Sequence, residues 1–255
     1  MPNDRFGFRF FPPTLARTPF ALRLPALKPA HGYRMFVFGE SAAQGDPDPT
    51  FGVSRYLETL LRDRFPGTDF EVVCVAMTAI NSHAVLPIAR ECARLDGDLW
   101  VVYMGNNEMV GPYGAGTVFG PQAPRRFFVR ASLAVKATRT GQLLARILGR
   151  WFAPGAAAQK SWTGMNMFKD HQLRRDDPAR LRAYDNFAAN LEGILQAARR
   201  AGVPVVLSTV ATTSRIARPS RRCTDASSTP ARARPGRSCS TTASRWRRPA
   251  TRARR

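Results

Sequence analysis

The sequence predicts an α/β protein: a three-layer α/β/α sandwich whose mostly parallel sheet is covered by helices on both faces. Three observations lead to this fold class. Apolar runs of strand length recur between residues 33 and 211, amphipathic stretches of helix length separate them, and glycine or proline stands near most of the boundaries. Strands and helices that alternate in this way build βαβ units, whose strands run parallel.

The first two elements are expected at 33–39 and 51–65. YRMFVFG (33–39) is a short apolar run that ends at a glycine, which is typical of a buried strand. The helix predicted over 51–65 has apolar residues at helical spacing along one face. These residues are Val53, Tyr56, Leu57, Leu60 and Leu61.

The same alternation continues with a strand at 70–77, a helix at 82–95 and a strand at 97–105. The two strands are the apolar runs FEVVCVAM and, after Gly97-Asp98, LWVVYMG. Pro87 either strains the helix or delays its start, because proline lacks the N–H that a helix interior uses.

The last predicted pair is a long helix at 177–202 and a strand at 203–211. Pro178 suits the first turn of this helix and Gly202 suits its end. The segment before the helix, 106–176, is longer than an ordinary connection, so we expect it to form a covering loop. It contains GPYGAGTVFGPQAP, which is rich in glycine but lacks the GxxxxGK[ST] spacing of a phosphate-binding loop.

Within that long connection, 130–151 has the pattern of an amphipathic helix, and its basic face indicates solvent more than a membrane. The chain has no apolar run long enough to span a bilayer. Its N-terminus, MPNDRFGFRFFPP, lacks the pattern of a signal peptide. An anchoring segment upstream of Met1 is left open by the sequence, as is the compartment.

The ends of the chain differ in composition from its middle. Residues 1–32 are rich in proline and aromatics, which predicts an extended arm whose aromatic side chains need a surface to cover. Residues 212–255 contain 13 Arg, one Asp and no Lys, so they carry +12 of the net charge of +21. The remaining 33–211 form the predicted domain. High net charge is typical of nucleic-acid binding, but here it belongs mostly to the tail, and no nucleic-acid partner is expected.

Cysteine spacing excludes two further classes of protein. The chain has Cys74, Cys92, Cys223 and Cys239, and no two of them form a CxxC pair. We therefore expect neither a disulfide framework nor a zinc site, and we expect no metal or cofactor.

Three polar or small residues follow predicted strand ends: Ser41, Ala79 and Asn107. Ligands of parallel sheets bind beyond the carboxyl ends of the strands, so these residues could converge on one crevice. Ser41 lies in FVFGESAAQGDP, where a buried strand runs into a tight turn. The turn could present Ser41 as a nucleophile, or it could be a polar turn that happens to contain serine.

Gly39-Glu40-Ser41 resembles the first sequence block of the SGNH (GDSL-type) hydrolases, with Glu40 where that family usually has Asp. GNNE (105–108) resembles the third block, Gly-x-Asn-Asp, and VAMTAINSH (75–83) stands where the second block lies. Four longer stretches look like a bacterial subgroup that combines an SGNH domain with tetratricopeptide repeats. They are RFGFRFFPPTLARTP, AMTAINSHAVLPIAR, VYMGNNEMVGPYGAGTVFGP and VPVVLSTVAT.

The resemblance implies an SGNH (flavodoxin-like) fold and a serine ester hydrolase, with Ser41 as the nucleophile. The oxyanion would be held by the backbone N–H groups of Ser41 and Ala79 and by the Asn107 amide. Ala79 stands at the family's oxyanion glycine, and alanine also has the N–H that this role requires. Asn107 could instead be a turn residue that caps the next segment. His83, beside Ser82 at a helix start, could be a base, a surface histidine or a capping histidine.

The family's general base comes from an Asp-x-x-His block that is missing here. The residues three positions before His31, His83 and His171 are lysine, isoleucine and phenylalanine. The chain is therefore expected to be a weak or inactive hydrolase as written, because loss of a base costs several orders of magnitude in rate.

The tail offers an explanation for the missing block. Arg, Ser, Thr, Ala and Pro make up residues 212–255 except at six positions, a composition that does not form a core. Permitted codons exist for 212–225 that spell NLKDCAPFASLHR in another frame, which resembles the subgroup's own continuation. We expect that the coding sequence is frameshifted near 212, so that the SGNH-like domain (33–211) is incomplete at its C-terminus. The alternative is a genuine disordered basic tail.

Three functions remain open from the sequence. The first is an SGNH-type hydrolase, or an acyl-transferring relative, acting on a small acyl ester or an acylated glycan. The second is a non-catalytic module that binds an acylated glycan or a protein partner in the same crevice. The third is nucleic-acid binding through the tail, which rests on charge alone.

Overall fold

The computed structural model describes residues 6–143 except 21, 23 and 26, residue 147, and residues 162–210. All the described residues belong to one compact unit within Met1–Arg218. The basic tail, 212–255, lies outside the described residues. Its expected disorder and its shifted reading frame stay predictions.

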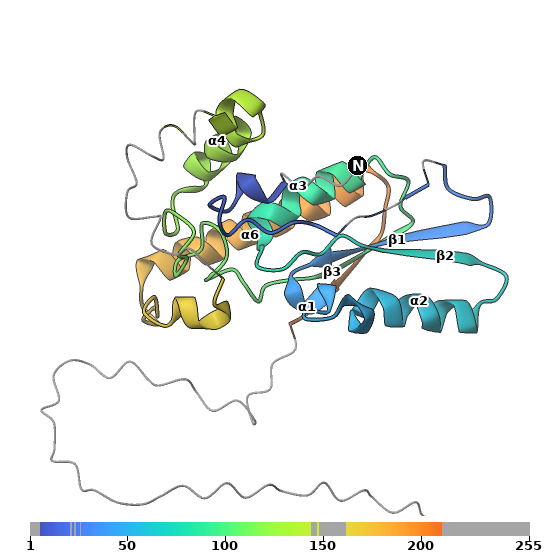
Figure 1. The fold of residues 1–255 in the computed structure, drawn as a ribbon. Helices are drawn as coiled ribbons and strands as arrows, with labels where there is room; N and C mark the ends of the chain where they lie inside the picture. The colour runs from blue at the N-terminus through green and yellow to red at the C-terminus, as the bar shows by residue number, and fades with distance from the viewer. Residues whose placement is uncertain are drawn as a thin grey trace, which may run out of the picture. The chain divides into compact units, whose positions relative to one another are not determined.

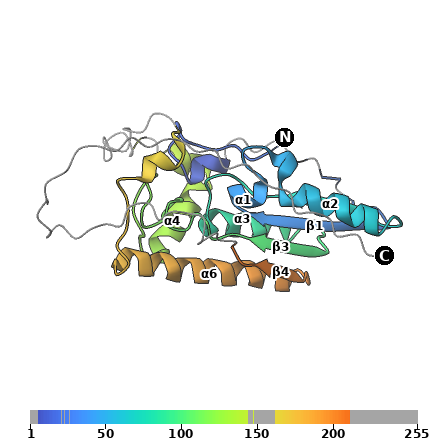
Figure 2. The same cartoon turned by 90° about the horizontal axis from the view of Figure 1, so that it is seen from below.

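Four parallel strands form one sheet in the order β2–β1–β3–β4 (β1 to β3 are labelled in Figure 1 and β4 in Figure 2). Helices flank the sheet on both faces, so the predicted α/β fold class is confirmed. The strands are β1 (Gly32–Gly39), β2 (Asp69–Cys74), β3 (Leu99–Tyr103) and β4 (Val205–Ser208).

The helices lie between the strands as the periodicity predicts. Among the described residues, the α-helices include α1 (Ser41–Gln44), α2 (Val53–Arg64), α3 (Ser82–Cys92), α4 (Arg126–Lys136) and α6 (Pro178–Arg200). Short 3₁₀ helices are η1 (Phe6–Arg9), η2 (Pro49–Phe51) and η4 (Gly164–Phe168). α3 and α6 run side by side along one face of the sheet, and α2 covers the other (Figures 1 and 2).

Alternation along β1 divides its side chains between two cores. Phe36 and Phe38 belong to the large core beneath α3 and α6, whereas Met35 and Val37 belong to a smaller one beneath α2. Successive side chains of a strand point to opposite faces, and both faces of this strand are buried. This explains why the strand is an unbroken apolar run rather than an alternating pattern.

The proline- and aromatic-rich N-terminal segment packs on the domain. Phe6, Phe10, Phe11 and Leu15 are buried in the large core, and η1 forms at the start of the segment. The segment is thus not extended throughout. Four large apolar side chains in the core make this segment part of the fold's hydrophobic stabilisation.

Two helix predictions need correction. In α2 only Leu57 and Leu61 of the expected apolar face pack against the sheet, while Val53, Tyr56 and Leu60 are exposed. The helix predicted at 130–151 begins earlier, at Arg126, and ends at Lys136; helical structure resumes at 139–143, and most of the remainder lies outside the described residues. The Thr138 hydroxyl accepts the Gly141 N–H there and thereby caps the second helical stretch.

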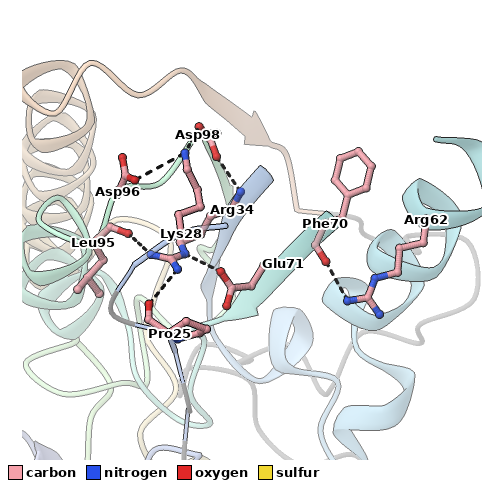
Figure 3. A network of polar contacts seen from close by, with 9 residues as sticks. All are labelled: Pro25, Lys28, Arg34, Arg62, Phe70, Glu71, Leu95, Asp96 and Asp98. Carbon is pink, nitrogen blue, oxygen red and sulfur yellow. Dashed lines mark hydrogen bonds and ion pairs between the residues drawn. The ribbon is translucent and has the colours of Figure 1, made fainter. Parts of the chain in front are cut away.

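A buried arginine joins three segments near the amino edge of the sheet (Figure 3). The Arg34 side chain is 1% exposed and donates to the Glu71 carboxylate at 2.6 Å, and to the carbonyls of Leu95 (2.7 Å) and Pro25 (3.0 Å). Asp98 accepts the Arg34 backbone N–H and a Lys28 ammonium hydrogen, both at 2.7 Å. A buried guanidinium is tolerated because its donors find acceptors.

Candidate functional site

A pocket of about 180 Å³ lies beyond the carboxyl ends of the strands, and all three residues singled out at strand ends line it. Its lining combines a polar side with an apolar one. The residues are Ser41, Asp46, Thr78, Ala79, Asn107, Val110, Gly111, Phe119, Trp162, Gly164 and Phe168. The position of the pocket agrees with the general rule that ligands of parallel α/β sheets bind beyond the carboxyl ends of the strands.

Ser41 is the first residue of α1, directly after β1 and Glu40. Gly39 permits this turn because a side chain there would overlap the Tyr103 carbonyl oxygen and the Ala43 methyl group. The helix is only one turn long and ends at Gly45, whose φ is 91°. Among the described residues the Ser41 hydroxyl has no hydrogen-bond partner, so it is free to meet a ligand.

Asn107 is held over the pocket by two sets of bonds. Its backbone N–H donates to the Glu40 carboxylate at 2.8 Å, and its side-chain Nδ2 donates to the Ile80 carbonyl at 3.1 Å. A primary amide nitrogen carries two hydrogens, so one remains for a ligand. The backbone carbonyl of Asn107 accepts the N–H of Gly111 at 2.6 Å, which closes a tight turn after β3.

Glu40 is the residue that connects the turns after β1 and β3. Its carboxylate is 1% exposed and accepts the N–H of Gly105 at 3.2 Å as well as that of Asn107. Burial, followed by the nearby Glu108 carboxyl, raises the pKa of Glu40 to about 8, although the backbone N–H donors oppose the rise. Glu40 therefore fixes Asn107 relative to Ser41.

Ala79 adopts a backbone conformation that favours glycine, with a φ of 66°. Its methyl group is buried in the large core. Among the described residues its N–H donates no hydrogen bond. Left-handed backbone costs roughly 1–2 kcal/mol for an L-residue, so the surrounding structure must hold Ala79 in place.

Aromatic rings form the apolar side of the pocket. Phe119 stacks on Trp162, with ring centroids 6.0 Å apart and planes 4° from parallel, and it meets Phe168 edge-on at 5.8 Å. Phe11 supports Phe119 from behind at 4.9 Å, and the Arg17 guanidinium lies 4.2 Å from the Trp162 ring. The long connection thus supplies the covering structure that its length suggested.

His83 lies in a buried network and not in the pocket lining, so it is not a surface histidine. Its Nδ1 contacts the Asn190 amide at 3.0 Å, and Asn190 also donates to the Ser82 hydroxyl at 3.0 Å. Burial is the main cause that lowers the pKa of His83 to about 4. α3 begins at Ser82 with Asn81 as the N-cap residue, so His83 does not cap the helix either.

Glu108 completes this network and was not singled out from the sequence. Its carboxylate accepts the Ser82 N–H at 2.7 Å and is 2.9 Å from the Ser82 hydroxyl. Burial raises the pKa of Glu108 to about 7, and the two Ser82 donors oppose the rise. The network joins the turn after β3 to the N-terminus of α3 and to the middle of α6.

No histidine is among the described residues that line the pocket. His31 precedes β1, at the opposite edge of the sheet from Ser41, and His171 contacts Gln122 through Nδ1 at 3.0 Å. The one acidic residue in the described lining is Asp46, whose backbone N–H donates to the Ser41 carbonyl at 3.0 Å.

Within the described residues, no helix is long and apolar enough to cross a membrane. The same part of the chain brings no three histidine, cysteine, aspartate or glutamate side chains together as metal ligands.

The fold is similar to that of solved structures of other proteins. It is similar to the solved structure of AlinE4, a SGNH-hydrolase family esterase, at 16% identity, over 70% of this chain and 77% of that chain, with a TM-score of 0.29. It is also similar to TesA, at 19% identity, over 63% of this chain and 99% of that chain, with a TM-score of 0.28. No family model matches the chain. No curated protein matches it either.

Proposed function

We propose that this pocket is the active site of an SGNH-type serine ester hydrolase. The observation that supports the proposal most is the convergence of an unpartnered Ser41 hydroxyl, the Asn107 amide and the Ala79 backbone on one pocket. A nucleophile and oxyanion donors around a single concavity are what acyl transfer requires.

In the proposed reaction the Ser41 Oγ attacks the ester carbonyl carbon, and the carbonyl oxygen becomes an oxyanion. The Ser41 and Ala79 N–H groups and the Asn107 Nδ2 donate to that oxygen, and each donor is typically worth roughly 3–4 kcal/mol of barrier. The alcohol leaves with the proton from Ser41, and water then releases the acid from the acyl-serine.

Glu40 acts as a positioning residue in this scheme. It does not line the pocket, but it accepts the Asn107 N–H and so sets where the Asn107 amide lies. A carboxylate bonded to backbone N–H groups on a turn rigidifies that turn, which pre-organises the oxyanion donors.

The aromatic side of the pocket supports a small acyl group as the substrate's reacting part. Phe119, Trp162, Phe168 and Val110 offer apolar surface, and about 180 Å³ of space holds few atoms beyond the ester itself. A small acyl ester or an acylated glycan remains the proposed substrate, and a tetratricopeptide-repeat-associated SGNH subgroup remains the proposed relative.

The absent base sets the expected rate. Since no histidine is among the described lining residues, Ser41 lacks the partner that would take its proton, and we expect slow turnover of the chain as written. We propose further that the general base was lost through a frameshift near residue 212.

The test compares the chain as written with a version in which one nucleotide near codon 212 restores the other frame. Hydrolysis of p-nitrophenyl acetate should rise by several orders of magnitude in the restored protein. Ser41→Ala should abolish the gain, and Asn107→Ala should reduce kcat by roughly 10²–10³-fold.

His83→Gln is the matched control, because it removes the one buried histidine of the described residues and leaves the pocket lining intact. It should change kcat little, with circular dichroism confirming the fold. Fast hydrolysis by the chain as written that is lost in His83→Gln would overturn the assignment.

A second candidate is a non-catalytic module that binds an acylated ligand. It is favoured by the same histidine-free lining, because binding needs the pocket and its donors but not a base. Binding of a non-hydrolysable ester analogue that Asn107→Ala weakens, with no turnover in the restored frame, would favour this candidate.

A further inference from the structure

A second and larger pocket, of about 460 Å³, lies away from Ser41 and shares no lining residue with the first one. It lies between the C-terminal halves of α3 and α6, with Arg130 of α4 on its rim. α3 and α6 run side by side here (Figure 2). Its size falls in the range of small-molecule sites.

Four arginines converge on this pocket from three helices and one turn. Arg90 lies on α3, Arg94 just after it, Arg130 on α4 and Arg200 on α6. In the described part of the chain none of the four guanidinium groups forms an ion pair or a hydrogen bond. Four cations around one concavity repel one another, so an anion between them would be stabilised.

The charge around the pocket is uncompensated. The nearest acidic residues on the same helices are Glu91 and Glu192, and Glu192 accepts the Gln196 amide instead of an arginine. Burial first, and then Arg130, Arg126 and Arg200, lower the pKa of Arg90 below its ordinary value. The direction of this shift is what an electropositive, partly enclosed space produces.

The floor of the pocket leaves room for a ligand, because it is made of small residues: Ala93, Gly193, Ala197 and Ala201. At Gly193 an added Cβ would lie 3.1 Å from a Leu86 methyl group, so α6 packs closely on α3 there. The Gln196 amide adds a neutral polar group to the lining.

Helix dipoles account for only part of the arrangement. Arg90 and Arg200 lie in the last turns of α3 and α6, where cations are favourable. Arg130 lies within α4, away from a helix C-terminus, so it does not have this explanation.

We propose that this second pocket, the arginine pocket, binds a small soluble molecule that carries two or more phosphate groups. Guanidinium groups bind phosphate oxygens in pairs of parallel hydrogen bonds, and four of them match more than one phosphate. The proposal does not depend on Ser41 or on the ester hydrolase function, since the two pockets share no residue.

The test measures the binding of sodium tripolyphosphate to the full chain by titration calorimetry. The buffer contains about 0.15 M NaCl, which screens weak attraction to the protein surface. The double variant Arg90→Gln/Arg130→Gln should weaken binding about tenfold or more, because charge-assisted hydrogen bonds are lost. The control Arg55→Gln/Arg139→Gln removes the same charge outside the pocket and should keep the affinity within about twofold.

Melting temperatures of the free proteins show whether each variant is folded, and Arg130→Gln alone, at an exposed position, replaces the double variant if that one unfolds. Orthophosphate, with one phosphate, should bind more weakly than tripolyphosphate. Equal losses in the pocket and control variants would assign binding to net charge and the basic tail, and would overturn the proposal. Binding to vesicles of an anionic lipid without binding to tripolyphosphate would overturn it as well.

Discussion

Arg34, near the amino edge of the sheet, is buried with a carboxylate and two carbonyls around its guanidinium, whereas Glu40 and Glu108, at the carboxyl edge, are buried without a cation. In the described residues the two glutamates form hydrogen bonds to backbone N–H groups and a serine but no ion pair. Burial is thus compensated by opposite charge at one edge and by neutral dipoles at the other. The first arrangement favours stability, and the second keeps donors and turns in place at the cost of raised pKa values.

The largest expected effect is at the amino edge. Arg34→Met leaves Glu71 and two carbonyls without their donor, so the free energy of unfolding should fall by about 2–4 kcal/mol. Urea unfolding followed by circular dichroism measures it. Adding Glu71→Met should recover part of the loss, since no carboxylate is then left unpaired. A single variant within about 0.5 kcal/mol of the parent would contradict this account of the network.

The stability contributed by the two glutamates at the carboxyl edge should fall as pH rises, whereas a carboxylate in an ordinary ion pair contributes stability that is lost as pH falls. The folded-state pKa values of Glu108 and Glu40, about 7 and about 8, lie above the ordinary value of 4.5. The folded state therefore binds more protons than the unfolded state between these limits. The stabilisation is fully present below about pH 4.5 and is lost as pH rises through 7 to 8.

Urea unfolding at about pH 5 and about pH 8.5 checks this expectation, and Glu108 alone should account for at most roughly 3 kcal/mol. Glu108→Gln keeps the acceptor for the Ser82 N–H but cannot titrate, so it should flatten part of the slope. An unchanged slope in that variant would assign the pH dependence to other groups.

A smaller effect is expected at Ala79. Ala79→Val places a β-branched side chain at positive φ and should destabilise the fold by about 2 kcal/mol. Ala79→Gly relieves the strain but loses a buried methyl group and gains unfolded-state entropy, so its net effect should stay within about 1 kcal/mol of zero. Thermal unfolding of the two variants separates backbone strain from loss of packing. A glycine variant as unstable as the valine variant would show that packing dominates.

The smallest effect is expected at Lys28. Its ion pair with Asp98, at 2.7 Å, is partly exposed, and such pairs contribute about 0–1 kcal/mol. Lys28→Gln should therefore shift the urea midpoint only slightly, and the shift should shrink further in high salt. A loss as large as that of Arg34→Met would mean that a partly exposed ion pair at the amino edge stabilises the fold as much as the buried guanidinium does.

The sequence was sufficient for the order of strands and helices, because apolar period and glycine or proline boundaries are local signals. It also placed Ser41, Ala79 and Asn107 correctly at strand ends, and the structure brings them to one pocket. Parallel strands share a carboxyl edge, so this juxtaposition follows from the fold class itself.

What could not be predicted depends on contacts between distant segments. Arg34 stands inside an apolar run, and only the fold shows that Glu71 and Leu95 surround it. The positive φ of Ala79 could not be predicted from the residue type, because alanine, unlike glycine, disfavours this conformation. The arginine pocket needs three helices to meet before its charges become a cluster. The signal available for Glu108 was an acid next to Asn107 in GNNE, which indicates a buried partner only once α3 is placed.

The contact between Phe11 and Phe119 has a consequence for the time order in which the protein is made. The N-terminal ring leaves the ribosome early, whereas Phe119, Trp162 and Phe168 follow much later. Until they are synthesised, the ring of Phe11 has no partner on that side, and β1 can pair with β2 before any pocket exists. Ser41 is thus in place long before the aromatic surface that forms the other side of its pocket.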